Sequence, residues 1–144
     1  MLCVPIIASQ FVEKVIPLVD AAKNSLDTCV FDWRWYPNDP GSPCQRFNQS
    51  IVRAVRRGVK VRALVNSQSV AETLRSVGVE VKHHYSAHLL HLKMMIIDQD
   101  VVITGSHNYT QSAFSANQEL SVVLGGVGQN SEFQQFFDRL FTTQ

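Results

Sequence analysis

The stretch HLKMMIIDQDVVITGSHN, His91–Asn108, sets polar side chains among residues typical of a buried β-hairpin. Its two apolar runs, Met94–Ile97 and Val101–Thr104, are rich in side chains that favour strands, and Asp98–Asp100 between them has the composition of a turn. The stretch therefore predicts two antiparallel strands. Asp98 would then lie at the turn end, where we expect it to act structurally or electrostatically through the fold.

The other polar side chains of this hairpin are predicted to meet at its open end. Side chains alternate along a strand, so His91 and Lys93 project to one face. The return strand brings Gly105, Ser106 and Asn108 back to the same end. The hairpin thus gathers an imidazole, an ammonium, a hydroxyl and an amide.

Such a set suits a phosphodiester. Imidazole can act as a nucleophile or as a general acid or base at neutral pH, while Lys93, Ser106 and Asn108 can hold the non-bridging oxygens as their charge grows. Gly105 would let the backbone approach the phosphate closely. We expect no metal and no cofactor, because the protein itself supplies the positive and hydrogen-bonding groups.

The spacing of these residues resembles the HKD motif of the phospholipase D superfamily: His91-x-Lys93-x4-Asp98-x6-Gly105-Ser106-x-Asn108, with Glu119 as the later acidic residue. The order of helices and strands resembles the small, single-motif endonuclease branch of that family. The resemblance implies that His91 forms a phosphohistidine or acts as the acid, and that Lys93, Ser106 and Asn108 bind phosphate. It also implies that Glu119 orients the imidazole and that the motif aspartate is structural.

Other interpretations of the histidines remain open. A zinc site could use the four neighbouring imidazoles, although no cysteine or carboxylate joins them and Lys93 would repel a cation; they are His83, His84, His88 and His91. His107 alternates with Ser106 and Asn108, so we expect it to face away from the site, in packing or at the surface. Asp100 is expected to serve the turn.

Strands and helices alternate along the chain, which predicts an α/β fold: a mixed, mostly parallel central sheet of about seven strands with helices on both faces. The expected strands are Leu2–Ile7, Thr28–Trp33, Val59–Val65, Val79–His83, Lys93–Asp98, Val101–Thr104 and Glu119–Leu124. The expected helices cover residues 10–26, with a kink at Pro17, and residues 44–58, 67–78 and 130–141. Residues 1–144 are expected to form a single phospholipase D-like domain.

One imidazole cannot both attack phosphorus and protonate the oxygen that departs on the opposite side, so a second acid is required. Residues 1–82 contain no histidine, and no second His-x-Lys occurs. We therefore expect a homodimer whose twofold axis places His91 and Lys93 of both protomers around one phosphate. The alternative donors within the chain are His84 and His88.

The substrate is expected to be nucleic acid, with DNA favoured over RNA. The net charge is only +1, but six basic residues without an acidic neighbour suggest a local polyanion site: Arg46, Arg53, Arg56, Arg57, Lys60 and Arg62. Among them Arg53 and Arg57 are the candidate substrate-binding residues, and an ordinary solvated helix face is the alternative. Trp35 and Tyr36 could stack bases at the edge of the loop Arg34–Cys44, whereas Phe31, Trp33 and Trp35 alternate as if packed in the core.

Two rival functions use the same residues. A phospholipid phosphodiesterase would share the site but would need an exposed apolar rim, and the apolar C-terminal helix is expected to pack on the sheet instead. A nucleic-acid-binding module with a vestigial site is the third possibility, against which the intact motif stands.

The remaining composition suggests a cytoplasmic protein without stable membrane insertion. The start, MLCVPIIASQ, has no positive n-region and is far too short to span a bilayer. Cys3, Cys29 and Cys44 are odd in number and at no metal-ligand spacing, so we expect reduced thiols that behave as small buried hydrophobic residues.

Overall fold

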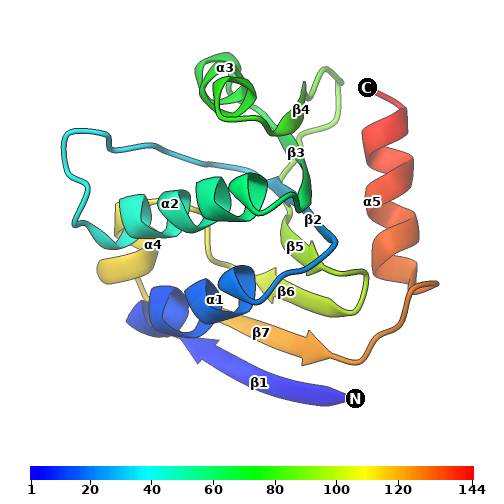
Figure 1. Cartoon of the computed structure of the whole chain (residues 1–144), viewed down its shortest axis with the longest axis horizontal. Helices are drawn as coiled ribbons and strands as arrows, with labels where there is room; N and C mark the ends of the chain where they lie inside the picture. The colour runs from blue at the N-terminus through cyan, green and yellow to red at the C-terminus, as the bar shows by residue number, and fades with distance from the viewer.

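Seven strands form one mixed sheet in the order β1-β7-β6-β5-β2-β3-β4, as a computed structural model of residues 1–144 shows (Figure 1). The strands are β1 (Leu2–Ile7), β2 (Ser25–Val30), β3 (Lys60–Val65), β4 (Glu80–His83), β5 (Lys93–Ile97), β6 (Val101–Gly105) and β7 (Leu120–Gly125). The helices are α1 (Phe11–Asp20), α2 (Pro43–Arg56), α3 (Gln68–Ser76), α4 (Gln111–Ser115) and α5 (Glu132–Thr142), with a 3-10 turn at Ala8–Gln10.

The predicted α/β class and the seven strands are confirmed, but the expectation of a mostly parallel sheet is wrong. Only the β2–β3 and β3–β4 pairs are parallel; the other four pairs are antiparallel. Parallel neighbours need a crossover, and only α2 and α3 supply one between adjacent strands. β5 and β6 are instead joined by the short turn at Asp98–Asp100, which makes them a hairpin.

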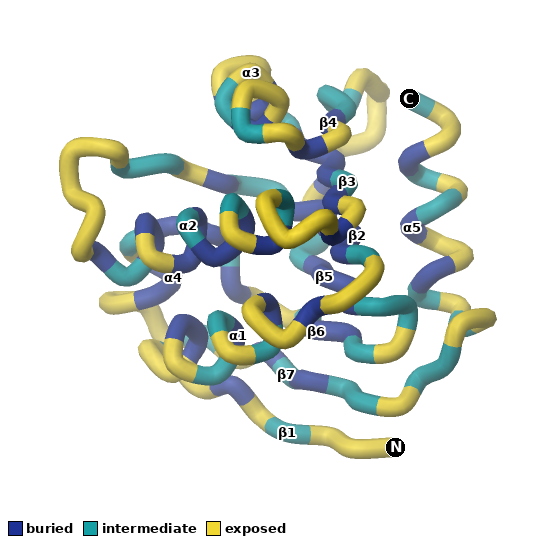
Figure 2. Tube along the Cα trace, in the orientation of Figure 1, coloured by how far each residue is buried: buried dark blue, intermediate teal, exposed yellow.

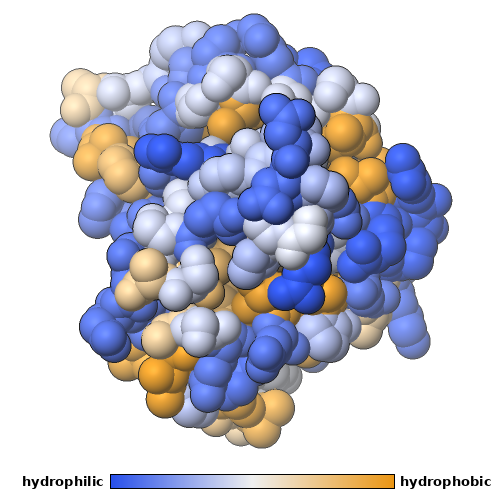
Figure 3. All heavy atoms as spheres, turned by 90° about the vertical axis from the view of Figure 1, so that its left-hand side faces the viewer, coloured by the Kyte–Doolittle hydropathy of each residue, from blue (hydrophilic) through white to orange (hydrophobic).

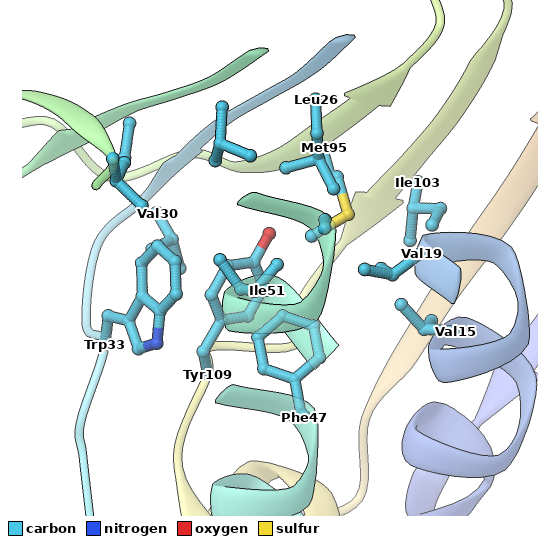
Figure 4. Close-up of a cluster of buried hydrophobic side chains, with 14 of the residues drawn as sticks. Val15, Val19, Leu26, Val30, Trp33, Phe47, Ile51, Met95, Ile103 and Tyr109 are labelled. Atoms are coloured by element: carbon cyan, nitrogen blue, oxygen red, sulfur yellow. The ribbon is translucent and has the colours of Figure 1, made fainter. Parts of the chain in front are cut away.

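Helices cover both faces of the sheet, as predicted. The larger core lies under α1 and α2, where Val15, Val19, Phe47 and Ile51 meet the strands (Figure 4). A smaller core lies under α5, built around Phe137 and its neighbours. Figure 2 shows the central strands largely buried, with exposed residues on the helices and loops outside them.

The hairpin strand β5 has no solvent-facing side. Met95 and Ile97 belong to the larger core, and Met94 and Ile96 belong to the smaller one. All four side chains are buried, which explains the unbroken apolar run in the sequence. Lys93, the first residue of β5, is the one residue of this strand that is partly exposed.

Some element boundaries differ from the sequence expectation. The first helix ends at Asp20 and does not continue to residue 26, so the second strand begins at Ser25 and not at Thr28. Pro17 lies inside α1. Both α4 and the 3-10 turn went unpredicted, because a helix of three to five residues leaves too short a hydrophobic period to detect.

Two of the three cysteines behave as expected. Cys29 and Cys44 are buried, while Cys3 is exposed, which corrects the expectation for that residue; all three are free. Burial first, and a nearby carboxylate second, raise the pKa of the Cys29 and Cys44 thiols to about 12. Neither thiol is therefore ionised at neutral pH.

Asp98 ties the hairpin turn to the loop between α1 and β2. Its carboxylate accepts hydrogen bonds from the backbone N–H groups of Lys23, Asn24 and Ser25 at 2.7–3.2 Å. Partial burial acts to raise the pKa of this carboxyl, but the three backbone donors outweigh it and hold the pKa below its usual value. This geometry agrees with the structural role expected of Asp98.

Replacing Asp98 should lower stability in a pH-dependent way. A depressed pKa in the folded state means that the stabilisation is present above the ordinary carboxyl pKa, near 3.9, and is lost as the pH falls through the folded value. We expect Asp98→Asn to lower the free energy of unfolding by about 1–3 kcal/mol at pH 7, and we expect this difference to shrink as the pH falls below the ordinary carboxyl pKa of about 3.9.

Urea unfolding from pH 2.5 to 7 measures this difference. Asp100→Asn is the matched control, because the Asp100 carboxylate in the same turn accepts a single backbone bond, from Gly128. A difference for Asp98→Asn that did not shrink on acidification would contradict the assignment.

Candidate active site

The polar residues of the motif lie at one edge of the sheet. β1, β2, β3, β4 and β6 end at this edge, and β5 and β7 begin there. It is the left-hand side of Figure 1 and faces the viewer in Figure 3, where hydrophilic side chains cover much of the surface and apolar ones lie among them. His91 precedes β5 and Ser106 follows β6, so both lie at the open end of the hairpin.

His91 and Lys93 share one aromatic neighbour. The ring of Phe31 lies 4.9 Å from the His91 ring, centroid to centroid, and 5.6 Å from the Lys93 ammonium. Phe31 was expected in the core, but it is only partly buried, because β2 ends at Val30 and the chain turns out of the sheet there. The sequence signal for this contact was weak, since an aromatic after a strand is usually core.

Asn108 has a fixed amide orientation. Its Oδ1 accepts a hydrogen bond from the Asp32 backbone N–H at 3.1 Å. A carbonyl oxygen must face that donor, so the amide Nδ2 group is on the other side, where it makes no hydrogen bond within the chain. Two N–H donors of Asn108 are thus available for an anion, as the phosphate-binding role requires.

Glu119 does not contact His91 within the chain, contrary to the expectation that it orients this imidazole. Its Oε1 accepts from the Ser106 hydroxyl at 2.5 Å, and its Oε2 accepts from the Asn117 amide at 3.0 Å. The Ser106 Oγ in turn accepts from the Leu120 backbone N–H. The proton of Ser106 is therefore held by Glu119, and a phosphate would have to compete for it.

His107 is buried in packing, which is one of the two settings expected for it, but it does not face away from the site, because it lines a small cavity together with Lys93. Its Nε2 donates to the Ala8 carbonyl at 2.8 Å, and Ser121 Oγ lies 2.7 Å from its Nδ1. Burial lowers the pKa of His107 more than the Ala8 bond and the Glu119 charge raise it. A neutral imidazole that joins the 3-10 turn to β7 has a packing role.

Close packing against β7 leaves no room for a side chain at Gly105. A Cβ there would lie 2.4 Å from the Cα of Ser121 and 2.5 Å from the Leu120 carbonyl oxygen. The close approach is to β7, so the predicted close approach to phosphate is not needed to explain this residue.

Asn66 is a site residue that sequence reasoning missed. Its Nδ2 donates to the carbonyls of Phe31, at 3.0 Å, and Leu90, at 2.9 Å. One side chain thus fixes both the aromatic neighbour of His91 and the residue that precedes His91. An asparagine at a strand end resembles any turn residue, so the sequence offers no distinct signal for it.

Three residues of the predicted basic patch are held by partners within the chain. Arg53 pairs with Asp20, Arg57 donates to the carbonyls of Val19 and Ala22, and both lie at the α1 end near the Asp98 turn, away from His91. Arg62 is on the α5 face, held by Asp27 and Asp138. Sequence proximity did not reveal these partners, because Asp20 and Asp138 come from distant segments.

Trp35 and Tyr36, the two residues predicted to stack bases, have different surroundings. Trp35 is partly buried against the larger core and also lines a groove beside the site. Tyr36 contacts α4 instead, where its hydroxyl accepts from the Gln111 backbone N–H. Trp33 is buried, as its alternation predicted.

The other histidines of the suggested zinc set lie on β4 and on the loop that follows it. His83 ends β4, and His84 and His88 line a groove against α5 together with Leu90 and Leu92. No three His, Cys, Asp or Glu side chains are grouped so as to hold a metal ion. The four-imidazole zinc arrangement is therefore not formed.

Comparison with known proteins agrees with this geometry. The family model described as the PLD-like domain of cardiolipin synthase matches residues 15–141, which include every motif residue from His91 to Glu119. The chain belongs to the phospholipase D-like family. The crystal structure of Nuc, a phospholipase D family member from Salmonella typhimurium, has the same fold, with a TM-score of 0.79 over 98% of this chain and 95% of Nuc at 21% identity.

Curated relatives carry the name mitochondrial cardiolipin hydrolase. The Xenopus tropicalis protein is 30% identical over 134 residues, which cover 89% of this chain and 60% of the relative. The Xenopus laevis protein is 33% identical over 130 residues, which cover 83% of this chain and 56% of the relative. This phospholipase D-like chain thus matches little more than half the length of those two relatives.

The orientation of Asn108 generates a test. Asn108→Asp keeps an oxygen for the Asp32 N–H but replaces the free amide donors with negative charge. We expect turnover of bis(p-nitrophenyl) phosphate to fall about 10²- to 10³-fold, because an anion-binding donor becomes a repulsive group.

The melting temperature of Asn108→Asp should stay within a few degrees of the wild type, because the Asp32 bond survives. Asn130→Asp is the control, since Asn130 is an exposed asparagine in the turn before α5, outside the motif. Near-normal turnover by Asn108→Asp would remove Asn108 from the set of phosphate ligands.

Proposed function

We propose that this phospholipase D-like chain is a metal-independent phosphodiesterase, and that it is an endonuclease acting on nucleic acid. The observation that carries the proposal is the group at the sheet edge: an exposed imidazole, His91, beside the Lys93 ammonium and the free amide donors of Asn108. These groups supply a nucleophile and compensating charge without a metal ion.

The proposed reaction has two displacements at phosphorus. A neutral His91 attacks in line, a nitrogen–phosphorus bond forms, and the bond to the leaving oxygen breaks as a second imidazole donates a proton to it. Water, deprotonated by that second imidazole, then attacks the phosphohistidine and releases His91. Lys93 and Asn108 hold the non-bridging oxygens in both steps.

The second imidazole is proposed to come from a partner protomer. His83 ends β4, and its Nε2 lies 2.6 Å from the Asn66 carbonyl oxygen, which occupies this ring nitrogen. His84 and His88 share their groove with Leu90 and Leu92, whose neighbours in the smaller core show that they face α5. His91 instead contacts Phe31, away from α5. His84 and His88 are therefore badly placed to protonate the oxygen that leaves when His91 attacks phosphorus.

An apolar surface beside the site supports the homodimer. Ile7 and Leu120 are opposite each other at the ends of β1 and β7 and are 52% and 58% exposed. They adjoin Ser106, whose Oγ accepts from the Leu120 N–H. A twofold partner that covered this pair would bring its own edge, and thus its own His91, toward the same phosphate.

Nucleic acid is the proposed substrate because the surroundings of His91 are polar. Exposed Arg34 follows β2 and exposed Arg46 lies in the first turn of α2, close to this edge. The apolar C-terminal helix, which a lipid hydrolase could use as its apolar rim, instead packs on the sheet through Phe137 and Phe141. DNA is the polymer to test first.

A second candidate is a phospholipid phosphodiesterase, which the names of the relatives favour. Tyr85, Leu89 and Phe136 are exposed around the groove between α5 and the loop that leads to His91. They could form the apolar rim that a lipid hydrolase needs. None of the helices has the length and apolar character to cross a bilayer.

A substrate panel in excess EDTA tests the function. We expect single- or double-stranded DNA to be cut and cardiolipin and phosphatidylcholine to be left intact. His91→Asn should lose cleavage and the base-stable, acid-labile adduct together, since the nucleophile is gone.

Three outcomes would contradict this proposal. Cleavage restored only by magnesium or zinc would exclude the metal-independent mechanism. Turnover of lipid without nucleic acid would favour the second candidate. Binding of DNA without any turnover would favour a vestigial site.

Subunit exchange tests the shared site. A mixed dimer with one His91→Ala chain lacks either the nucleophile or the acid, so activity should fall as the square of the wild-type fraction. The control is His88→Ala, because His88 is exposed and its replacement should not disturb the fold as that of buried His107 would. Mixing with His88→Ala chains should leave activity unchanged. Activity proportional to the wild-type fraction, or a fully active monomer in sedimentation, would refute the dimeric site.

A further inference from the structure

A groove adjoins the phosphate-binding residues and is not used by the mechanism above. The loop after β2 and the first turn of α3 enclose a volume of about 400 Å³. Its lining residues are Asp32–Trp35, Ser67, Ser69 and Val70. In Figure 1 the loop that leaves β2 passes below α3.

The groove is connected directly to the site through Asp32. The backbone N–H of Asp32 holds Asn108, and Asp32 itself lines the groove. Phe31, one residue earlier, contacts both His91 and Lys93. A phosphate held by Lys93 and Asn108 would therefore have one of its ester groups beside the groove.

The groove offers both a flat ring and polar groups. Trp35 supplies an indole anchored against the core, and Val70 a small apolar surface. The hydroxyls of Ser67 and Ser69 lie 3.0 Å apart at the start of α3. Aromatic faces with a few polar side chains suit a nucleoside, whose base stacks and whose edges and sugar hydrogen-bond.

The charges of the groove are balanced. The Asp32 carboxylate would repel a nearby phosphate, but Arg34 pairs with it at 3.3 Å. The Arg34 side chain remains 65% exposed, so it can also meet a second, outer phosphate of a strand. The volume falls within the range of about 300–1,000 Å³ that small-ligand sites occupy.

The other large grooves fit a nucleoside less well. The groove along α5 is lined mainly by apolar side chains and lies on the face opposite Phe31 and His91. The groove at Asp20–Lys23 and Arg57 is at the far end of the sheet, near the Asp98 turn. Only the groove at Asp32–Trp35 combines an aromatic face, hydroxyls and a guanidinium next to Asn108.

We propose that this groove is a subsite for the nucleoside that flanks the scissile phosphate. The proposal rests on the nuclease function and specifies how that site would distinguish nucleic acid from lipid or from simple diesters. Trp35 stacks on the base, the two serine hydroxyls hydrogen-bond to the base or sugar, and Arg34 neutralises the next phosphate.

The experiment compares substrates with and without a nucleoside. The p-nitrophenyl esters of thymidine 5′-phosphate and thymidine 3′-phosphate carry one, and bis(p-nitrophenyl) phosphate carries none. We expect the wild type to show a kcat/KM at least tenfold higher for one thymidine ester than for bis(p-nitrophenyl) phosphate. Ser69→Trp, which fills the groove from an exposed position of α3, should reduce that ratio at least tenfold.

Glu72→Trp is the matched control. It adds the same indole to the same helix at an exposed position outside the groove, so the ratio should not change. In the His91→Asn background, calorimetry should show the preferred thymidine ester bound at least tenfold more weakly after Ser69→Trp. A ratio near one for both esters, or no effect of Ser69→Trp on ratio and affinity, would overturn the subsite.

The two proposals fail separately. If DNA and RNA are cut but Ser69→Trp changes neither ratio nor affinity, the nuclease function stands and the subsite is refuted. If neither polymer is cut but a thymidine ester is preferred and Ser69→Trp removes the preference, the subsite stands and the endonuclease assignment is refuted.

Discussion

The antiparallel pairing of β2 with β5 is the constraint on which the site depends. At one end Asp98 binds the backbone of Lys23–Ser25 and fixes where β2 begins. At the other end Val30 pairs with Lys93, so Phe31 emerges beside His91. Four carboxylate hydrogen bonds at the turn therefore help to set the geometry of an imidazole a full strand length away, because a strand slip would move every side chain to the opposite face.

The edge of the sheet is supported by side chains with no chemistry of their own. Asn66 joins the end of β2 to the residue before His91, and Asp32 orients Asn108 through its backbone N–H. Such contacts orient the Asn108 amide and place the backbone before the exposed His91 imidazole without burying either side chain. An open site on loops and strand ends can be pre-organised in this way.

Several arginines of this protein are already engaged in contacts within the chain. Arg53, Arg57 and Arg62 hold helices to the sheet or to each other, so a single chain offers few free cations near His91. Lys93 shares the Phe31 ring with His91, and exposed Arg34 is paired with Asp32. A twofold partner would double this supply at the phosphate and add the missing acid, so the electrostatic and the chemical needs of the proposed mechanism lead to the same assembly.

The sequence by itself determined the family, the α/β class and the motif residues, because fixed spacing and strand alternation are local properties. It also placed Asp98 at the far end of the hairpin, since a turn between two strands is a local feature, but it left open whether His107 is buried or at the surface. Only the tertiary structure decided that most strand pairs are antiparallel, that Glu119 holds Ser106, and that the arginines already have partners. Those outcomes depend on which distant segments meet, as Asp20 meets Arg53 and Asn66 meets Leu90, and no local pattern in the chain encodes such encounters.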